Sequence, residues 1–310
     1  MHTLSDLPDL LPDLRLLVIH GEGRGGGERA ATKINDAYRA KGRAIDVIGS
    51  GNRPASKAAI QALQGVPGTP VLFSGGMRDL PGVLTARAAG VGFAAYFQVP
   101  YLRSLSISDP VHAAAVTAMV GFNRLFARHI FVNSAQGWPW WLQGQVLLPI
   151  ADAERVVQRP VEWPTAGLVR LATACRLFSE RGHGSKDVGS MLRLVEEVRA
   201  YNRSGNGQQI ELVHYGDVDD HHAALLDPHR DVLERRGYAT HWYTADPRVN
   251  GYFFFSHYEG FGLAPLEATK TGHPVFVNEG FPSELLTCGP VRRIMTGNAH
   301  RTILGQMVGA

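Results

Sequence analysis

The sequence predicts an α/β protein with two lobes, each built on a parallel sheet. In both halves of the chain, short apolar runs typical of buried strands alternate with helical segments. A stretch rich in Trp and Pro, residues 136–164, interrupts this alternation once. The length of 310 residues agrees with two domains, because one domain usually takes about 100–200 residues. We therefore predict one domain over residues 1–145 and a second over residues 146–310.

In the first half, the repeating unit is a strand, a glycine loop and a helix. Residues 14–19 are a short apolar run, and the loop 20–27 leads into residues 28–42, which have helical spacing and end at Gly42. Four later runs have the character of buried strands: 44–49, 70–75, 92–99 and 129–134. This order predicts parallel strands connected by helices.

The second half begins with the apolar run 167–178 and continues the same alternation. Helices are expected at 191–202 and 264–271, and strands at 209–216, 252–256 and 273–279. Ligands of such sheets bind at the carboxyl ends of the strands.

Composition excludes several classes of protein. The net charge is near neutral, 31 Lys and Arg against 28 Asp and Glu, and no basic stripe indicates a nucleic-acid partner. Cys175 and Cys288 cannot form a disulfide framework, and no zinc-ligand spacing occurs. Asp6, Asp9 and Asp13 stand where a secretory signal would carry positive charge. No run reaches 18 apolar residues, so we expect a cytoplasmic protein without a transmembrane segment, for which contact with a membrane surface stays open.

The most informative segment is residues 256–286. A strand end is followed by a loop with Gly260 and Gly262, then by a helix with Pro265 in its first turn, and Gly272 closes that helix. Loop amides and a helix start favour an anion at this point. The segment therefore predicts a phosphate or diphosphate site.

Two acids flank this predicted phosphate site. Glu259 precedes the loop and Glu267 lies in the helix, with seven residues between them. Carboxylates would repel a phosphate, so each is expected to accept hydrogen bonds from hydroxyl groups of the same ligand. A nucleotide sugar offers this pattern, with sugar hydroxyls, a diphosphate and a ribose.

The segment EGFGLAPLE contains the pattern E-x7-E, and it is followed by Ala, a glycine-terminated helix and G-x-P-V. This combination resembles the donor site of family 4 retaining glycosyltransferases. Four further segments match that family in the same order: 25–48, 126–135, 175–192 and 211–217. The resemblance covers most of residues 15–286. It implies the GT-B fold, in which two Rossmann-like lobes face each other across an interdomain cleft. The N-terminal lobe would be the acceptor side, the C-terminal lobe would bind the donor, and the last residues would be able to cross back.

The resemblance also implies an activity. The protein would be a retaining hexosyltransferase that moves a sugar from a UDP- or GDP-sugar to the hydroxyl of a small-molecule, glycan or lipid-linked acceptor. It would need no metal and no cofactor beyond the donor itself. The alternatives are a nucleotide-sugar epimerase or hydrolase of the same fold, and a non-catalytic nucleotide-sugar-binding protein.

Site roles follow from the resemblance, residue by residue. Arg176 and Lys186 would bind the donor diphosphate, Glu259 would hold the donor sugar and Glu267 the ribose. Backbone groups would complete the donor contacts, and these come from Gly25, Gly26, Phe261, Gly262 and Leu263.

The sequence departs from the family's pattern at two site positions. Nine residues separate Arg176 from Lys186 where the family usually has four, which makes Arg181 a rival phosphate ligand. Where many members have a histidine near the reacting sugar, the match here is Gln98, which can position a substrate but cannot act as a base.

Other features have less specific interpretations. The glycines over residues 21–26 fit G-x-G-x-x-G only loosely, without the acid that a dinucleotide site needs. The cluster at 216–222 reads as a solvated acidic loop rather than a metal site. Trp138, Trp140 and Trp141 are expected to pack a domain junction rather than an acceptor.

Overall fold

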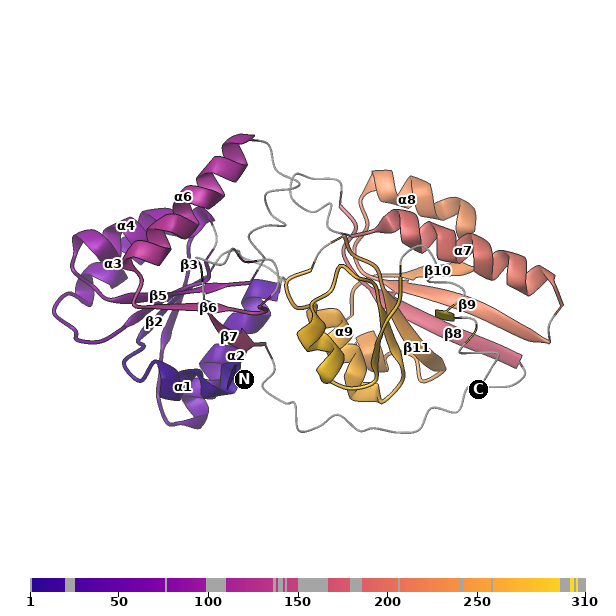
Figure 1. The fold of residues 1–310 in the computed structure, drawn as a ribbon, viewed down its shortest axis with the longest axis horizontal. Helices are drawn as coiled ribbons and strands as arrows, with labels where there is room; N and C mark the ends of the chain where they lie inside the picture. The colour runs from indigo at the N-terminus through magenta and orange to yellow at the C-terminus, as the bar shows by residue number, and fades with distance from the viewer. Residues whose placement is uncertain are drawn as a thin grey trace. The chain divides into compact units, whose positions relative to one another are not determined.

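The computed structural model divides into two compact units, Met1–Asp152 and Ala153–Ala310 (Figure 1). The residues that the structure describes are 2–19, 26–75, 77–98, 110–135, 138, 142, 144–149, 167–178, 186–205, 207–239, 242–257, 259–295, 302, 303 and 305. The division follows Asp152, whereas the sequence analysis placed it after residue 145, which lies in a strand. Both units are α/β with a parallel sheet, as predicted.

The N-terminal unit contains a seven-stranded sheet in the order β1-β7-β6-β5-β4-β2-β3, and all its pairings are parallel. Its strands are β1 (His2–Thr3), β2 (Leu16–Ile19), β3 (Asp46–Gly49), β4 (Val71–Phe73), β5 (Phe93–Phe97), β6 (His129–Val132) and β7 (Gln145–Leu148). The five predicted strands of this half are present. The sequence analysis missed β1 and β7, which form one edge of the sheet.

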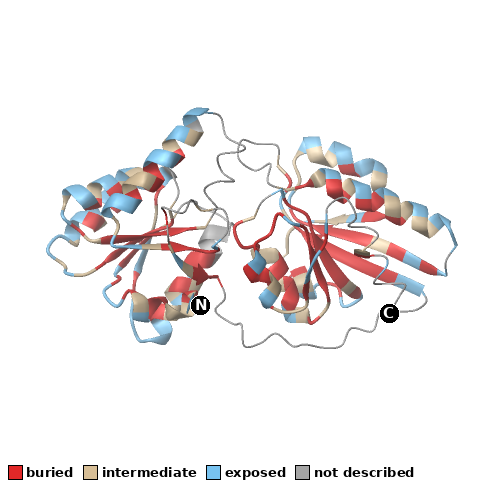
Figure 2. Ribbon diagram, in the orientation of Figure 1, coloured by how far each residue is buried: buried red, intermediate tan, exposed pale blue. Residues whose placement is uncertain are grey.

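Helices cover both faces of this sheet (Figures 1 and 2). One face carries η1 (Leu4–Asp6), α1 (Leu7–Leu10) and α2 (Gly26–Ala40), and the other carries α3 (Arg53–Ala62), η2 (Met77–Asp79), α4 (Leu80–Ala88) and α6 (Pro110–Phe126). Successive residues of β5 pack against the helices of different faces, because side chains along a strand point alternately to opposite sides of the sheet. Tyr96 packs with Tyr38 of α2, whereas Phe97 packs with Met119 of α6.

The C-terminal unit contains a six-stranded parallel sheet in the order β10-β9-β8-β11-β12-β13. The strands are β8 (Gly167–Ala174), β9 (Gln208–Tyr215), β10 (Leu233–Arg236), β11 (Val249–Phe254), β12 (Val275–Val277) and β13 (Val291–Arg293). The helical elements are α7 (Val188–Arg203), α8 (Asp220–Leu226), η4 (Asp227–His229), η5 (Trp242–Thr244), α9 (Leu263–Ala268), η6 (Thr269–Thr271) and η7 (Ser283–Thr287). The edge strands β10 and β13 were not predicted.

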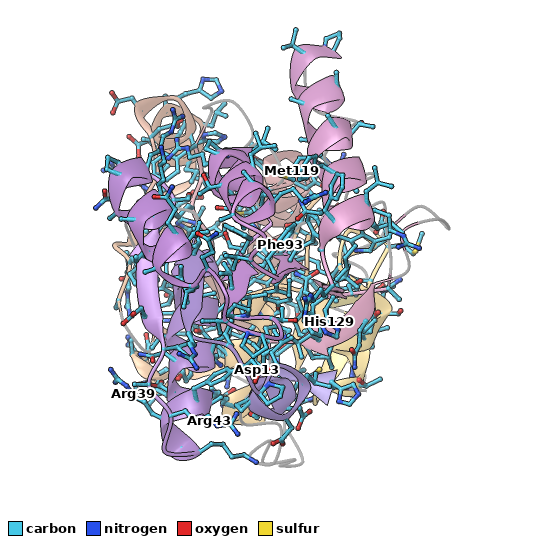
Figure 3. All side chains as sticks on the ribbon, turned by 90° about the vertical axis from the view of Figure 1, so that its left-hand side faces the viewer. Asp13, Arg39, Arg43, Phe93, Met119 and His129 are labelled. Atoms are coloured by element: carbon cyan, nitrogen blue, oxygen red, sulfur yellow. The ribbon has the colours of Figure 1, made fainter. Side chains whose placement is uncertain are left out.

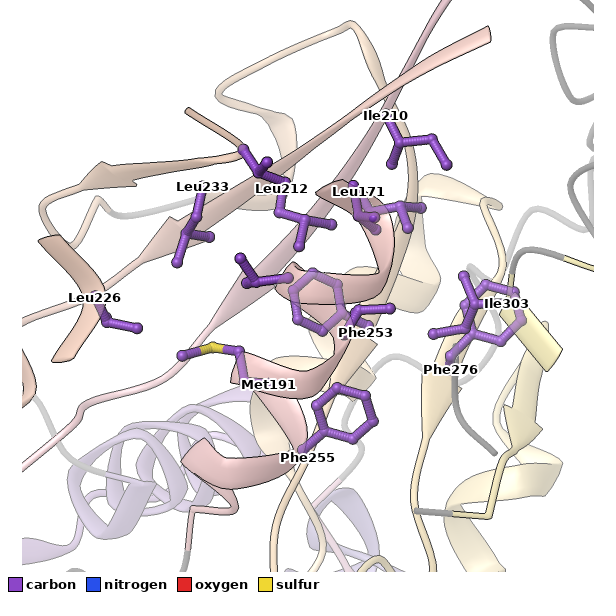
Figure 4. Close-up of a cluster of buried hydrophobic side chains, with 14 of the residues drawn as sticks. Leu171, Met191, Ile210, Leu212, Leu226, Leu233, Phe253, Phe255, Phe276 and Ile303 are labelled. Atoms are coloured by element: carbon purple, nitrogen blue, oxygen red, sulfur yellow. The ribbon is translucent and has the colours of Figure 1, made fainter. Parts of the chain in front are cut away.

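A buried apolar cluster joins α7 to this sheet (Figure 4). Met191 of α7 packs in the same cluster as Phe253 and Phe276 of the central strands. Ile303 is fully buried and belongs to this C-terminal core. Most residues beyond position 295 lie outside the described part, so the expected return of the last residues to the first lobe stays a prediction.

Candidate functional site

Two loops meet at the carboxyl edge of the C-terminal sheet. Lys186, before α7, forms an isolated antiparallel bridge with Ser256, which follows β11. The amide of Asp187 donates to the carbonyl of Phe255 at 3.2 Å. Asp187 also caps α7, since its carboxylate accepts from the Ser190 amide at 2.9 Å. These bonds hold the start of α7 beside the loop that contains Glu259.

The centre of the candidate site is an ion pair between Lys186 and Glu259. The Lys186 ammonium also donates to the Ser256 hydroxyl at 3.3 Å, and that hydroxyl lies 3.5 Å from the Glu259 carboxylate. The two charged side chains are 25% and 24% exposed. They are therefore shielded from bulk water yet open to a ligand, and the structure brings together two of the three predicted catalytic residues.

A second segment, after β12, supports the Glu259 loop. The Asn278 side chain accepts from the Ser256 amide at 3.0 Å and donates to the Ser256 carbonyl at 2.9 Å. The Glu259 amide donates to the Gly280 carbonyl at 2.8 Å. A Cβ atom at position 280 would lie 1.9 Å from the Ser256 carbonyl oxygen. The close approach of these two segments therefore requires glycine at position 280.

The predicted phosphate loop has the expected local structure. Gly262 has φ +88°, and a Cβ atom there would lie 2.8 Å from the Phe281 ring. It is the residue before α9, and no side chain caps that helix start among the described residues. The amides of Leu263 and Ala264 therefore point out of the first turn. Pro265 lies in that turn, as predicted, while Gly272 ends the helical segment with φ +77°.

Glu267, which lies on α9, has a protein partner in η5. The indole N–H of Trp242 donates to its carboxylate at 3.1 Å. Trp242 is 2% exposed and lies edge-on to Tyr252 and Phe254, and it also contacts Tyr215. A carboxylate accepts several hydrogen bonds, so the indole leaves capacity for others. The predicted contact of Glu267 with a ribose stays a prediction.

The turn that carries Trp242 is anchored by a buried carboxylate. Asp246 is 2% exposed and accepts hydrogen bonds from Arg248 and from Arg170, while Arg236 lies 3.3 Å away. Hydrogen bonds from Arg248, reinforced by Arg170, hold the pKa of Asp246 well below its usual range. The charge therefore stays on Asp246 across the physiological pH range.

A buried thiol, Cys175, lies close enough to the ion pair to be affected by both of its charges, and a buried imidazole, His214, contacts this cysteine. Burial raises the pKa of Cys175 to about 11, with the Lys186 charge opposing this and Glu259 reinforcing it. Burial lowers the pKa of His214 to about 4, although its Nε2 lies 3.0 Å from the Cys175 carbonyl. Both groups are therefore neutral near pH 7. Neither a thiolate nucleophile nor a charged imidazole is available here.

The remaining predicted residues lie elsewhere or outside the described part. Arg176 is exposed, two residues beyond the end of β8. Gln98 follows β5 in the N-terminal unit and is half-buried, and its carbonyl accepts from the Asn133 side chain. Gly26 is the first residue of α2. The calls for Gly25 and Arg181 lie outside the described residues.

The acidic cluster at 216–222 is not simply a solvated loop, which corrects that interpretation. Asp219 caps α8, because its carboxylate accepts from the His222 amide at 2.9 Å and pairs with the His222 ring.

No group of three or more His, Cys, Asp and Glu side chains suited to a metal occurs within the described ranges. In the same part of the chain, no helix is long and apolar enough to cross a bilayer.

The sequence analysis gave no site role of their own to four residues that organise the site: Ser256, Asn278, Gly280 and Trp242. Ser256, Asn278 and Gly280 lie within three residues after a strand of the segment it singled out, and polar or glycine residues shortly after parallel strands are a usable signal. Trp242 gives no such signal, because it is 25 residues from its partner Glu267.

Comparison with known proteins supports the architecture. No protein-family model matches the sequence, and no curated protein matches it. Solved structures do match. The lipopolysaccharide outer core galactosyltransferase WaaB aligns over 96% of this chain and 90% of its own, with 16% identity and a TM-score of 0.60. HepE from Anabaena in complex with UDP-glucose aligns over 94% and 88%, with 13% identity and a TM-score of 0.63.

A third similar structure is sucrose-phosphate synthase from Thermosynechococcus elongatus. It aligns over 94% of this chain and 90% of its own, with 14% identity and a TM-score of 0.59. At this level of identity the likeness concerns the fold. Together with the two parallel α/β units, it shows that the chain has the two-lobe GT-B fold.

Proposed function

We propose that this protein is a retaining glycosyltransferase of the family 4 type. It transfers a hexose from a UDP- or GDP-sugar to an acceptor hydroxyl. The similar structures support the proposal through what their names state: WaaB is a galactosyltransferase, and HepE is in complex with UDP-glucose. The E-x7-E segment supports the assignment to family 4.

The observation that carries the proposal is the pairing of Lys186 with Glu259 at the carboxyl edge of the C-terminal sheet. Parallel sheets bind ligands at this edge. The ammonium suits a diphosphate, and the carboxylate suits the hydroxyls of a sugar. The amides at the start of α9, after Gly262, add donors for phosphate oxygens. One small region of the C-terminal unit thus holds groups for both halves of a nucleotide sugar.

The reaction breaks the bond between the anomeric carbon and the diphosphate oxygen and forms a bond from that carbon to the acceptor oxygen. The electron pair of the broken bond leaves with the nucleoside diphosphate, which also takes the acceptor proton. In this proposal Lys186 exchanges part of its contact with Glu259 for the diphosphate, and stabilises the charge that develops there. Glu259 orients the donor sugar. No protein nucleophile is required, which agrees with the neutral Cys175 thiol near the pair.

Binding and turnover test this proposal separately. Calorimetric titration with UDP, GDP and their hexose conjugates measures binding, and NMR of the product gives the anomeric configuration. We expect Lys186→Met to lower kcat/KM by about 10²–10³-fold, the scale for loss of one charge-stabilising group. The matched control is Lys270→Met, an exposed lysine of the same unit, which should keep normal turnover.

Four results would contradict the proposal. Near-normal transfer by the folded Lys186→Met variant would remove Lys186 from catalysis. A product of inverted configuration would exclude retention, and loss of turnover with EDTA that Mg²⁺ restores would exclude metal independence. Turnover of the donor in the absence of any acceptor would favour the epimerase or hydrolase.

A further inference from the structure

Within the part of the chain that the structure describes, the helices α3, α4 and α6 of the N-terminal unit carry no acid. Between residues 47 and 151 the only acids are Asp79 and Asp109, and α3, α4 and α6 contain none. Asp79 is 1% exposed and its carboxylate accepts from the Ser74 hydroxyl at 3.0 Å. Six exposed cations lie on or beside these helices: Arg53, Lys57, Arg78, Arg87, Arg124 and Arg128. We call the outer surface of α3, α4 and α6 the basic face.

The basic face also exposes large apolar side chains. Leu125 near the end of α6 is 77% exposed, and Leu84 of α4 is 48% exposed. Phe126 is 38% exposed, and the Arg87 guanidinium lies 5.0 Å from the centre of its ring. Leu84 is one turn before Arg87 on α4. Cations and apolar groups are therefore intermixed on this face instead of lying in separate patches.

The opposite face of the same sheet has a different character. Its helix α2 and the segments around α1 carry acids as well as bases, and Lys41 pairs with Asp9 at 3.2 Å. Figure 3 shows Arg39 and Arg43 on that side, away from Met119 of α6. The lack of acids is thus a property of α3, α4 and α6 rather than of the whole unit. An asymmetric charge distribution of this kind attracts an extended anionic surface.

We propose that the basic face docks on a lipid bilayer that contains anionic headgroups. Each cation near such a surface contributes about 1 kcal/mol to binding, that is, about fivefold in affinity. Exposed leucine and phenylalanine beside the cations fit the interface, where apolar groups enter the acyl boundary. Nucleic acid is the less suitable partner, because it offers phosphates but no environment that favours exposed leucine side chains. The inference does not depend on the proposed enzymatic function.

Sedimentation with vesicles tests the proposal on the full chain. Vesicles of phosphatidylcholine are compared with vesicles that contain about one third phosphatidylglycerol, at low and high salt. We expect binding only to the anionic vesicles, weakened by salt. The variant Lys57→Glu/Arg87→Glu should bind at least about 25-fold more weakly, from fivefold per lost cation. Leu125→Ser should weaken binding while leaving the charge unchanged.

The matched control is Arg15→Glu/Arg39→Glu, which makes the same charge change at exposed positions away from the basic face. It should keep most of the affinity, and thermal unfolding confirms that each variant is folded. Equal binding to both vesicle types would overturn the proposal, as would an equal loss in the control variant. Tight binding of duplex DNA that Leu125→Ser leaves unchanged, without vesicle binding, would overturn it in favour of nucleic acid.

Discussion

The support of Glu259 by Gly280 makes a prediction that can be worked from the geometry. In Gly280→Ala, the new Cβ atom would lie 1.9 Å from the Ser256 carbonyl oxygen and 2.7 Å from the carbonyl carbon. Such contacts are normally no closer than 3.0 Å, so the two segments must separate by about 1 Å. Neighbouring backbone cannot yield as a flexible side chain would, and the hydrogen bond from the Glu259 amide to the Gly280 carbonyl connects the same two segments.

Two separate magnitudes follow. Overpacking of this kind costs about 1–3 kcal/mol, and a backbone clash belongs at the upper end, about 2–3 kcal/mol. For a unit of this size that loss lowers the midpoint of thermal unfolding by about 4–12 °C. A displacement of about 1 Å at a substrate-positioning group costs on the order of 10²-fold in turnover. The proposed transfer should therefore fall by about that factor, even far below the unfolding temperature.

The assay compares Gly280→Ala with Gly237→Ala. Gly237 lies in the same unit, a Cβ atom there would meet nothing within 4 Å, and its φ is not left-handed. Urea unfolding gives the stability change, and kcat/KM measured well below the midpoint gives the effect on the site. Equal stability of the two variants would refute the steric reasoning. A destabilised Gly280→Ala variant with normal turnover would refute the link between this contact and Glu259.

Three further predictions concern the C-terminal unit. The pKa of His214 is lowered from 6.5 to about 4, so as the pH falls the unfolded chain binds the extra proton before the folded chain does. About 3 kcal/mol of stability is therefore lost between pH 6.5 and pH 4. In urea titrations His214→Gln should remove this part of the pH dependence, and an unchanged slope would contradict the assignment. Trp242→Phe keeps an aromatic ring but removes the indole N–H that donates to Glu267, so the donor KM should rise several-fold with kcat nearly unchanged. Steady-state kinetics that show the reverse would argue against positioning by Trp242. Asp246→Asn removes the buried counter-charge of the Arg170 guanidinium, which is 7% exposed and then keeps only Glu211, 43% exposed, as an acidic partner within the described ranges. It should cost about 1.5–3 kcal/mol in calorimetric or urea unfolding, and a loss below about 1 kcal/mol would disprove this reasoning.

Much of the fold could be predicted because buried parallel strands are continuous apolar runs. The runs at 14–19 and 92–99 correspond to β2 and β5, with ends trimmed by two residues or fewer. Strand β10 was missed because its sequence, Leu-Glu-Arg-Arg, contains three charged residues. It is an edge strand, so these side chains reach solvent or ion pairs such as Arg236 with Glu234. Edge strands escape a search for apolar runs for this reason.

The site was predictable only in part. The local features of residues 256–286 could be predicted, because the positions of Gly262 before the helix and of Pro265 in its first turn are read directly from the sequence. The meeting of Lys186 with Glu259 is different, since it depends on pairing between segments more than 70 residues apart. The nine-residue interval before Lys186 made its place uncertain from sequence. The acids after Gly216 misled for a different, local reason: Asp219 serves as a helix cap.

The frame around Ser256 consists mainly of backbone hydrogen bonds, completed by the single amide side chain of Asn278. A frame of this composition depends little on the identity of the side chains that surround it. Most neighbouring positions can therefore be substituted during evolution without a change in the backbone path, provided that a side-chain amide remains at position 278 and glycine remains at position 280. This tolerance agrees with a shared architecture at 13–16% identity, and it identifies these two positions as the ones where drift would be least tolerated.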